Sequence, residues 1–260
     1  MNGSGRVGSS VSDCELEPLP SSPAPVLVGV SDGYKRWAPS YDHFPNPLLA
    51  REQRHVLPLL PSLRNRRVLD LACGTGRWLE HLLAVGALPA VGVDLSSAML
   101  RVAGDKKELS GRVVQGDCLR LPFQDSTFDF SICSFALGHI QDLASFAAEH
   151  SRVMKPDSDL FVTDLHPEAY AIGWRTGFRE RESVVQVRTL PHSAEQILGT
   201  FSSFGCECVT HVDLYMGNAE EPLFAAAGKQ QSFQAACRVS AILFCHFKQV
   251  SPATAHRRMP

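Results

Sequence analysis

The clearest pattern in the chain is an alternation of short apolar runs with amphipathic stretches between residues 67 and 164. Apolar runs are typical of buried strands, whereas apolar positions three and four residues apart are typical of helices that cover a sheet. The runs predict strands at residues 67–72, 90–95, 112–116, 128–134 and 159–164. Helices are predicted after Gly76, after an N-cap at Ser96 or Ser97, and over residues 143–154. This order predicts an α/β fold with a parallel sheet and right-handed crossovers.

The alternation ends after Asp164. Residues 165–192 hold no helical stretch of crossover length and mix aromatic residues, glycine and arginine with one β-like stretch, so they predict a small inserted cap. A helix capped by Ser193 and two late strands, at residues 206–215 and 239–247, follow the cap. The two late strands can pair antiparallel.

Aromatic residues and prolines alternate ahead of the first strand, within residues 34–63. Such a segment is either an arm that packs on the core or a lid that contacts a ligand. The length of 260 residues suits one α/β domain, which we expect over residues 31–250. Residues 1–30 and 251–260 are rich in Ser, Gly and Pro and are expected to be disordered tails.

The composition of the chain limits the kinds of partner that it can bind. The net charge of -2 gives no field that would attract nucleic acid or an anionic membrane, so a small-molecule partner is expected. Eight cysteines scattered along a long chain indicate a reduced, cytoplasmic protein. The spacings of the cysteines and histidines match no metal motif, and no metal is expected. No apolar run is long enough to span a bilayer, and the polar start is unlike a signal peptide.

A glycine turn, Gly74 and Gly76, joins the first strand to its helix and allows a ligand to approach the backbone and the helix N-terminus. A dinucleotide fingerprint would require a third glycine where Leu79 stands, which disfavours a nicotinamide cofactor. Asp94 ends the next strand, where a carboxylate can accept both hydroxyls of a ribose; capping the following helix is the alternative. These positions predict an adenosine-containing ligand.

Two further strand ends carry ligand-type residues. Asp117 follows the third strand and could accept from the amine of an adenine, and the stretch from Ser134 to Ile140 follows the fourth strand. The carboxyl ends of parallel strands meet at one edge of a sheet, which is where such sheets bind ligands. The strand ends therefore predict one site.

The segments VLDLACGTGRW, VGVDLSSAML, VVQGDCLRLPF, FDFSICSFALGHIQDL and SRVMKPDSDLFVTDLHP resemble, in order and spacing, the successive motifs of class I S-adenosylmethionine-dependent methyltransferases. The resemblance covers residues 34–166. Within the class it is greatest to the branch of ubiquinone and menaquinone biosynthesis and malonyl carrier-protein methyltransferases, in which Tyr41-Asp42 matches a YD pair. It implies a Rossmann-like, seven-stranded, mostly parallel sheet with helices on both faces and an antiparallel last strand.

The same resemblance implies S-adenosylmethionine as cofactor and methyl transfer to an O, C or N atom of a small-molecule acceptor. The implied cofactor-binding residues are Tyr41, Asp70, Ala72, Cys73, Gly74, Gly76, Asp94, Leu95, Met99, Gly116, Asp117, Cys118, Ser134 and Phe135. Among them Asp70 would lie by the methionine part, Asp94 by the ribose, and Leu95 and Met99 on either side of the adenine. One departure is Pro156-Asp157-Ser158, where the family has P-G-G, in a turn away from the cofactor.

Methyl transfer needs a base only when the attacking atom must lose a proton. His139 follows the fourth strand and is the first candidate, because a histidine pKa of about 6.5 suits proton acceptance near neutral pH. His139 could instead serve the structure alone, and His166, after the fifth strand, is the second candidate. The acceptor is expected to contact Tyr34, Trp37, Trp174, Arg175 and His192.

Two other functions remain open from the sequence. The fold and cofactor could serve a reaction without methylation, such as a cyclisation or decarboxylation. The chain could also be a non-catalytic partner subunit. As a methyltransferase it would be a monomer or a homodimer.

Overall fold

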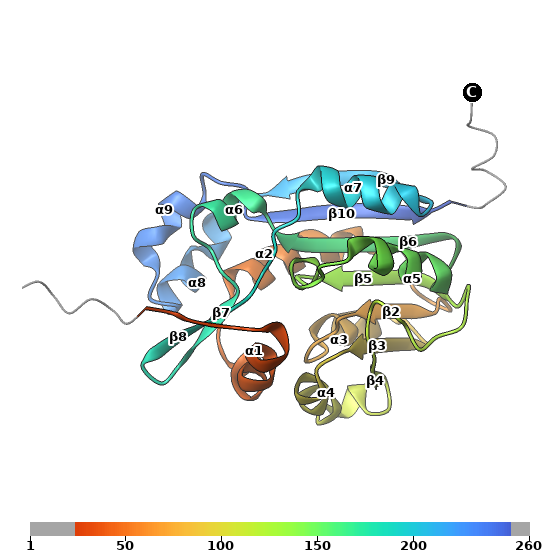
Figure 1. Cartoon of the computed structure of the whole chain (residues 1–260), viewed down its shortest axis with the longest axis horizontal. Coiled ribbons are helices and arrows are strands. Elements are labelled where there is room, and N and C mark those ends of the chain that lie inside the picture. Colours follow the sequence, from red (N-terminus) through yellow and green to blue (C-terminus); the bar gives the residue numbers. More distant parts are fainter. Residues whose placement is uncertain (1–23, 251–260) are drawn as a thin grey trace, which may run out of the picture.

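The computed structural model describes residues 24–250, which form a seven-stranded sheet and a smaller three-stranded sheet (Figure 1). The large sheet has the order β4-β3-β2-β5-β6-β10-β9. Its strands are β2 (Val68–Leu71), β3 (Ala90–Asp94), β4 (Val113–Gln115), β5 (Phe128–Ser134), β6 (Met154–Leu165), β9 (Cys206–Leu214) and β10 (Ile242–Gln249). Neighbouring strands are parallel except at β10, which runs antiparallel to both β6 and β9. The predicted sheet with its antiparallel last strand is confirmed.

Helices cover both faces of this sheet, as predicted. Alternate residues of each strand point to opposite faces, so Leu69 joins one apolar cluster and Val68 the other. The first cluster contains α5 (Leu143–Val153) and α7 (Ala194–Ser203). The second is formed with α2 (Pro47–Val56), α3 (Arg77–Ala84) and α4 (Ser97–Gly104).

The second sheet contains residues from both ends of the domain. β1 (Val26–Val28) pairs in parallel with β8 (Ser183–Val187), and β8 forms a hairpin with β7 (Gly177–Glu180). The predicted N-terminal tail over residues 1–30 is therefore wrong at its end, because Val26 and Val28 lie opposite Val185 and Val187 in this ladder. The rest of that tail, residues 1–23, and the predicted tail at 251–260 lie outside the described residues.

The predicted cap is the β7–β8 hairpin preceded by a short helix, α6 (Pro167–Ala171). A second insertion, between β9 and β10, was not predicted. It consists of α8 (Glu221–Ala226) and α9 (Phe233–Ala236), and it buries Phe224 and Phe233. Short 3₁₀ turns complete the chain at Ala38–His43, Leu57–Leu59, Lys107–Leu109, Leu137–His139, Asn218–Glu220 and Gln230–Ser232.

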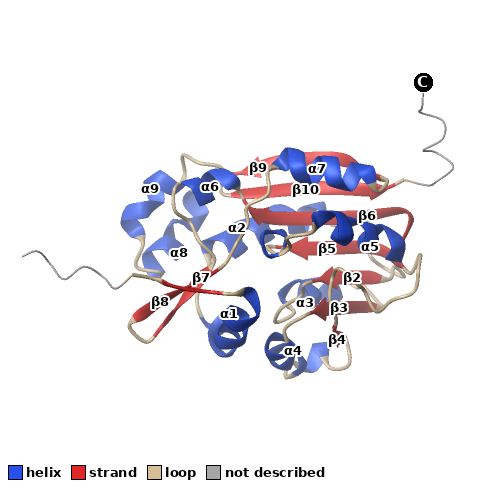
Figure 2. Cartoon of the chain, viewed as in Figure 1, coloured by secondary structure: helices blue, strands red, loops and turns tan. Residues whose placement is uncertain are grey.

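Residues 26–56, which we call the lid, cross the carboxyl edge of the large sheet. α1 (Val30–Trp37) and the small sheet lie beside the ends of the parallel strands (Figure 2). Gly33 is required where α1 meets β8, because a Cβ there would lie 2.6 Å from a methyl carbon of Val187. No helix within residues 24–250 has the length and apolar character needed to cross a membrane.

Candidate cofactor and acceptor site

The turn after β2 combines open space with unusual backbone angles. Gly74 and Gly76 have φ of 56° and 82°, and a Cβ at Gly76 would lie 2.3 Å from the Cδ1 of Leu109. A Cβ at Gly74 would meet nothing within 4 Å, so a ligand can approach the backbone there. Ala72 and Phe135 also have positive φ, although neither is glycine. Strained residues at two adjacent strand ends are typical of a functional site.

Asp70 is buried at the end of β2, and its Oδ2 atom has no hydrogen-bond partner among the described residues. Burial raises the pKa of this carboxyl group to about 8. A buried, unpartnered carboxylate oxygen is costly unless a ligand donor meets it. A ligand ammonium group would supply both the donor and the opposite charge.

Asp94 ends β3 and joins the two loops on either side of it. Its Oδ2 accepts from the backbone N–H of Gly74 at 2.8 Å and its Oδ1 accepts from that of Ser96 at 2.7 Å. Burial raises the pKa of Asp94. Ser96 caps α4, accepting from the N–H of Met99, so Asp94 is not the helix cap. Each carboxylate oxygen keeps a lone pair that can accept from a ribose hydroxyl.

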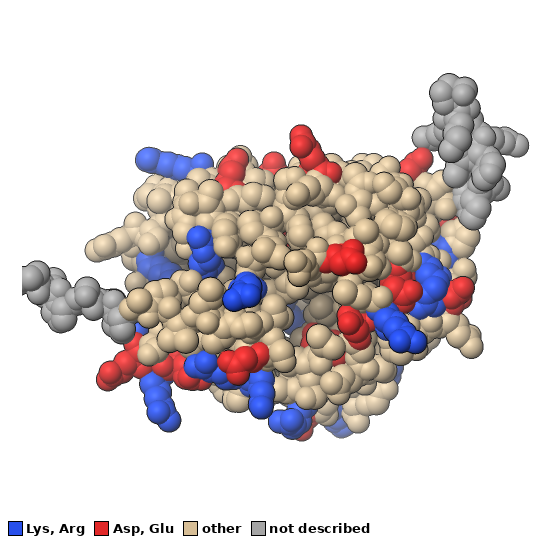
Figure 3. All heavy atoms as spheres, viewed as in Figure 1, with Lys and Arg blue, Asp and Glu red and all other residues tan. Residues whose placement is uncertain are grey.

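A cavity of about 490 Å³ lies between α1 and α4. Leu95 and Gln115 line it together with residues of both helices, and the surface is hollowed at this place in Figure 3. The exposed side chain of Leu95 is available to a flat ring. Met99, predicted to flank the ring from the other side, is buried in the domain and does not line the cavity.

The loop after β4 carries Asp117 and Cys118. The Oδ1 of Asp117 accepts from the N–H of Leu119 at 2.9 Å, which leaves its other oxygen for a ligand amine. Cys118 is buried, and burial raises the pKa of its thiol to about 12, so it stays protonated. Gly116 is needed because a Cβ there would lie 2.9 Å from a methyl carbon of Val93.

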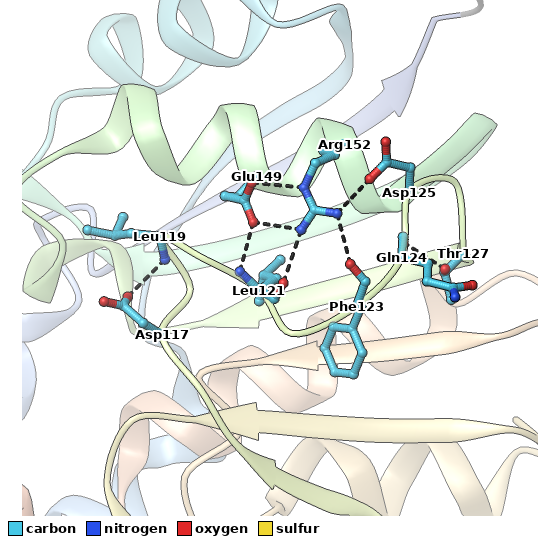
Figure 4. Close-up of polar contacts among 9 residues, drawn as sticks. All are labelled: Asp117, Leu119, Leu121, Phe123, Gln124, Asp125, Thr127, Glu149 and Arg152. Carbon is cyan, nitrogen blue, oxygen red and sulfur yellow. Dashed lines mark hydrogen bonds and ion pairs between the residues drawn. The ribbon is translucent and has the colours of Figure 1, made fainter.

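Arg152 of α5 holds this loop in place (Figure 4). Its guanidinium donates to the carbonyl oxygens of Leu121 and Phe123 at 3.0 and 2.8 Å, and to Asp125 at 2.7 Å. Glu149 accepts from Arg152 at 2.8 Å and from the N–H of Leu121 at 2.8 Å. These contacts fix the backbone that positions Asp117.

Glu52 of α2 forms a buried network behind the glycine turn that the sequence did not reveal. The side chain is fully buried and accepts hydrogen bonds from Arg77 at 2.5 Å, Ser134 at 2.6 Å, Trp78 at 3.2 Å and Thr163. Its partners come from α3, β5 and β6. The carboxylate of Glu52 thus anchors the lid beneath the strand ends. Ser134, which the sequence predicted as a cofactor residue, donates one of the hydrogen bonds to this carboxylate.

Asp42 attaches the lid directly to the glycine turn. Its Oδ1 accepts from the hydroxyl of Thr75 at 2.7 Å, and Lys106 lies 3.1 Å from its Oδ2. The neighbouring Tyr41 is packed against Trp37, with ring centroids 4.8 Å apart. Burial raises the pKa of Tyr41 to about 12. The Tyr41-Asp42 pair therefore closes the lid over the turn.

His139 lies under the lid. Its Nε2 is 2.8 Å from the hydroxyl oxygen of Tyr34, and its Nδ1 is 3.2 Å from the carbonyl oxygen of Arg188. A carbonyl oxygen only accepts, so Nδ1 carries the proton and Nε2 accepts from Tyr34. Burial lowers the pKa of His139, so the ring is neutral at neutral pH.

Asp164 and His192 support the loop that carries His139. Asp164 is buried and accepts from the N–H of Gly138 at 2.6 Å and that of Leu165 at 2.7 Å. Burial raises its pKa to about 6. His192 lies 3.0 Å from the carbonyl oxygen of Ile140 through its Nε2. The structure thus places His192 beside this loop, as a supporting residue.

Aromatic side chains of the lid and the cap form a wall next to His139. Trp37 stacks on Tyr34 and on Phe178 of β7, with centroid distances of 5.9 and 5.1 Å. Arg36 and Glu180 form an ion pair at 2.6 Å that joins the same two segments. Tyr34 and Trp37, predicted from the sequence as acceptor residues, lie together in this wall.

His166, the second base candidate, caps α6. Its Nδ1 accepts from the N–H of Glu168 at 3.1 Å, and its Nε2 lies 3.3 Å from Asp213 of β9. Both ring nitrogens of His166 have partners within the domain, and its catalytic role stays a prediction.

Trp174 and Arg175, predicted acceptor residues, also have structural contacts. Trp174 packs toward Phe224 of the second insertion, with ring centroids 6.5 Å apart. The guanidinium of Arg175 lies 3.7 Å from the ring centroid of Tyr170 and donates to the Tyr170 carbonyl at 2.6 Å. The structure thus places both side chains against neighbours of the cap and the second insertion, and contact with the acceptor stays a prediction for each. Residues 24–250 contain no group of three or more His, Cys, Asp or Glu side chains able to hold a metal ion.

Comparisons with known proteins agree with this geometry. Residues 69–162 match the methyltransferase domain family. The chain is 35% identical over 136 residues to a demethylmenaquinone methyltransferase of Lactiplantibacillus plantarum, covering 47% of this chain and 56% of the relative. It is 39% identical over 108 residues to a 2-phytyl-1,4-naphtoquinone methyltransferase of Synechococcus elongatus, covering 38% and 46%. The chain thus spans about half the length of these curated relatives.

The fold is shared with solved structures at lower identity. An S-adenosylmethionine-dependent methyltransferase of Mesorhizobium loti superposes with a TM-score of 0.61 at 17% identity, covering 78% of this chain and all of that one. A seven-stranded sheet with a reversed last strand, a glycine turn and a ribose-type carboxylate defines an α/β protein that binds a nucleoside ligand. Residues 69–162 thus match a methyltransferase domain, and the fold is that of S-adenosylmethionine-dependent methyltransferases.

The residues at the carboxyl edge fit the cofactor of this family. The unpartnered Oδ2 of Asp70 suits the ammonium group of its methionine part, and the open space at Gly74 admits the ligand to the backbone. Asp94 keeps lone pairs for the ribose hydroxyls.

Proposed function

We propose that the protein transfers a methyl group from S-adenosylmethionine to a small aromatic acceptor of the quinone type. The observation that carries the proposal is the unpartnered, buried oxygen of Asp70 beside the open glycine turn, which calls for a cationic ligand group. The acceptor class is supported by the relatives, whose names specify demethylmenaquinone and a naphtoquinone. We further propose that the described residues, 24–250, act as one domain.

In this proposal Asp70 binds the ammonium group, Asp94 the ribose and Asp117 the adenine edge. Tyr41, Ala72, Cys73, Gly116, Cys118 and Phe135 complete the cofactor site. S-adenosylmethionine, when bound, supplies a methyl group on a sulfonium sulfur that is already a good leaving group. The chain's own contribution is to align the acceptor and exclude water, for which the lid with its latch between Asp42 and Thr75 is suited.

A quinone ring is electron-poor and cannot attack a methyl cation donor, so the acceptor must enter in its reduced, hydroquinone form. A phenolic hydroxyl has a pKa of about 10 and gains nucleophilicity when it loses its proton. His139 is neutral, has its Nε2 lone pair directed to the lid, and is the base that we assign. The aromatic wall of Trp37 and Phe178 provides stacking surface for a flat ring.

We also propose that the protein works in the cytoplasm, as a monomer or homodimer, without nucleic acid. The low net charge of -2 supports the absence of a nucleic-acid partner, as do the interspersed positive and negative side chains on the face in Figure 3.

The test uses methyl-labelled S-adenosylmethionine and 1,4-naphthohydroquinone as probe, under a reductant and without oxygen. We expect labelled methylated product and one S-adenosylhomocysteine per product. Consumption of the probe without S-adenosylhomocysteine would favour a reaction other than methylation. If the protein does not bind S-adenosylhomocysteine in calorimetry, the cofactor site is refuted. A non-catalytic partner subunit would then be the function that remains.

A further inference from the structure

Tyr34 stands between the two halves of the site. Its hydroxyl is 2.8 Å from His139. The ionisable groups that act on it electrostatically are Tyr41 in the lid, Asp94 at the end of β3 and Asp164 at the end of β6. The charge of Asp94, which we assign to the ribose, and that of Asp164, which supports the loop of His139, therefore both act on the phenol.

The tautomer of His139 determines the direction of the hydrogen bond. The Nδ1 proton is donated to the Arg188 carbonyl, so the lone pair on Nε2 receives the proton of the Tyr34 hydroxyl. Nε2 is then occupied, and an incoming hydroxyl cannot use it directly. The oxygen of Tyr34 still has lone pairs, and it is the atom of the pair that can accept from an acceptor hydroxyl.

Resting on the function proposed above, we infer that Tyr34 is a second catalytic residue, which relays the proton of the acceptor hydroxyl to Nε2 of His139. The O–H bond of the acceptor breaks and its proton joins the oxygen of Tyr34, while the original Tyr34 proton moves to Nε2. The acceptor's freed electron pair, on oxygen or a conjugated ring carbon, forms the bond to the methyl carbon. Where the ring carbon attacks, it then loses its hydrogen as a proton, the ring oxygen regains a proton, and the aromatic ring is restored. The pair of the broken S–CH₃ bond stays on sulfur, and His139 later releases its proton to water.

Packing holds Tyr34 in place for this step. The ring stacks on Trp37 and meets the edge of His139 at a centroid distance of 5.2 Å. Burial raises the pKa of Tyr34 and lowers that of His139, so both groups are neutral before the acceptor arrives. Tyr34 belongs to the lid and His139 to the sheet edge, so the proton path depends on the contact between these two segments.

The first test needs no acceptor. Selective ¹⁵N-histidine NMR of the full chain is recorded for the wild type, for Tyr34→Phe and for Tyr215→Phe as a matched control. Tyr215 accepts a hydrogen bond from Ser240 at 3.1 Å and is half-exposed on another part of the domain. We expect one Nε2 resonance to shift toward the value of a free ring nitrogen in Tyr34→Phe, and His139→Gln to identify it. An unchanged Nε2 resonance overturns the pairing and with it the relay.

The second test measures turnover of 1,4-naphthohydroquinone. We expect Tyr34→Phe to lower kcat at neutral pH by at least about tenfold, toward the range of about 10²–10⁴ typical of positioned acid–base groups. The affinity for S-adenosylhomocysteine should stay within about twofold, because Tyr34 makes no assigned cofactor contact. The loss should shrink as the pH approaches about 10, where the probe ionises without help, and a merely structural role would not produce this profile.

The outcomes separate the two proposals. A wild-type rate in Tyr34→Phe, with the wild type active, overturns the relay and leaves the methyltransferase proposal standing. A wild type that binds S-adenosylhomocysteine but methylates no hydroxylated probe overturns the acceptor class, and the NMR comparison then decides on the pairing by itself.

Discussion

Cofactor binding at Asp70 is coupled to the release of a proton from its carboxyl group. Its pKa of about 8 means that the carboxyl group is about nine-tenths protonated at pH 7 before the cofactor binds. Pairing with the ligand's ammonium group requires the carboxylate form. We therefore expect binding of S-adenosylhomocysteine to release about 0.9 proton at pH 7. Asp70→Asn has no such proton and should release none, and it should bind about 10- to 150-fold more weakly for loss of a charged hydrogen bond.

Calorimetry in two buffers of different ionisation enthalpy counts the released protons. Equal proton release from the wild type and Asp70→Asn would refute the assignment of Asp70 to the ammonium group.

The raised pKa of Asp70 also makes the stability of the folded chain depend on pH. Burial raises the folded-state pKa from 3.8 to about 8, so between these pH values the folded chain holds a proton that the unfolded chain has lost. Stability conferred at this site is therefore highest below pH 4 and falls as the pH rises to about 8, by about 4 kcal/mol at pH 7. Asp70→Asn removes this dependence. We compare the free energies of unfolding in urea, without cofactor, between pH 4 and pH 7. The stability of Asp70→Asn relative to the wild type should increase as the pH rises over this range. A difference in unfolding free energy that is constant with pH would contradict the reasoning.

Three further changes test the rest of the edge. Asp94→Ala should weaken S-adenosylhomocysteine binding by about 1–3 kcal/mol, measured by calorimetry, because it removes the ribose acceptor and frees the N–H of Gly74; unchanged affinity would exclude the ribose role. Glu52→Gln should lower the free energy of unfolding in urea by about 3–5 kcal/mol, because it leaves the guanidinium of Arg77 without its anion. An unchanged free energy of unfolding would show that the hydroxyl partners of residue 52 stabilise the network without the charge. Arg152→Ala should cost about 1.5–3 kcal/mol and speed hydrogen exchange of residues 117–127, with Arg152→Lys intermediate; protection equal to the wild type would show that the loop holds without the clamp.

The cofactor edge was predictable because its signals are local. A strand, its terminal residue and the following turn are contiguous in the sequence, and parallel strands bring their ends together. Asp94 needed only its position after a strand, and Ser96 only its position before a helix. The confirmed mostly parallel sheet follows from the same logic, since strands alternate with helices along residues 67–164.

The parts that the sequence did not reveal depend on distant partners. Glu52 meets Thr163 across 111 residues, and its surroundings in the sequence are those of an ordinary amphipathic helix. β1 is three residues long and exists through its ladder with β8. The sequence also did not show that Nε2 of His166 lies 3.3 Å from Asp213, on a strand far along the chain. The short helices α8 and α9 are stabilised by burying Phe224 and Phe233 rather than by any pattern of their own.

The lid also bears on the order in which the protein is made. Tyr34 is synthesised 105 residues before its partner His139. Arg36 is synthesised 144 residues before its partner Glu180. Contacts of such long range form late, after the local units of the sheet. The lid therefore gains its partners at the acceptor pocket only after more than 100 further residues, including the cap, have been made.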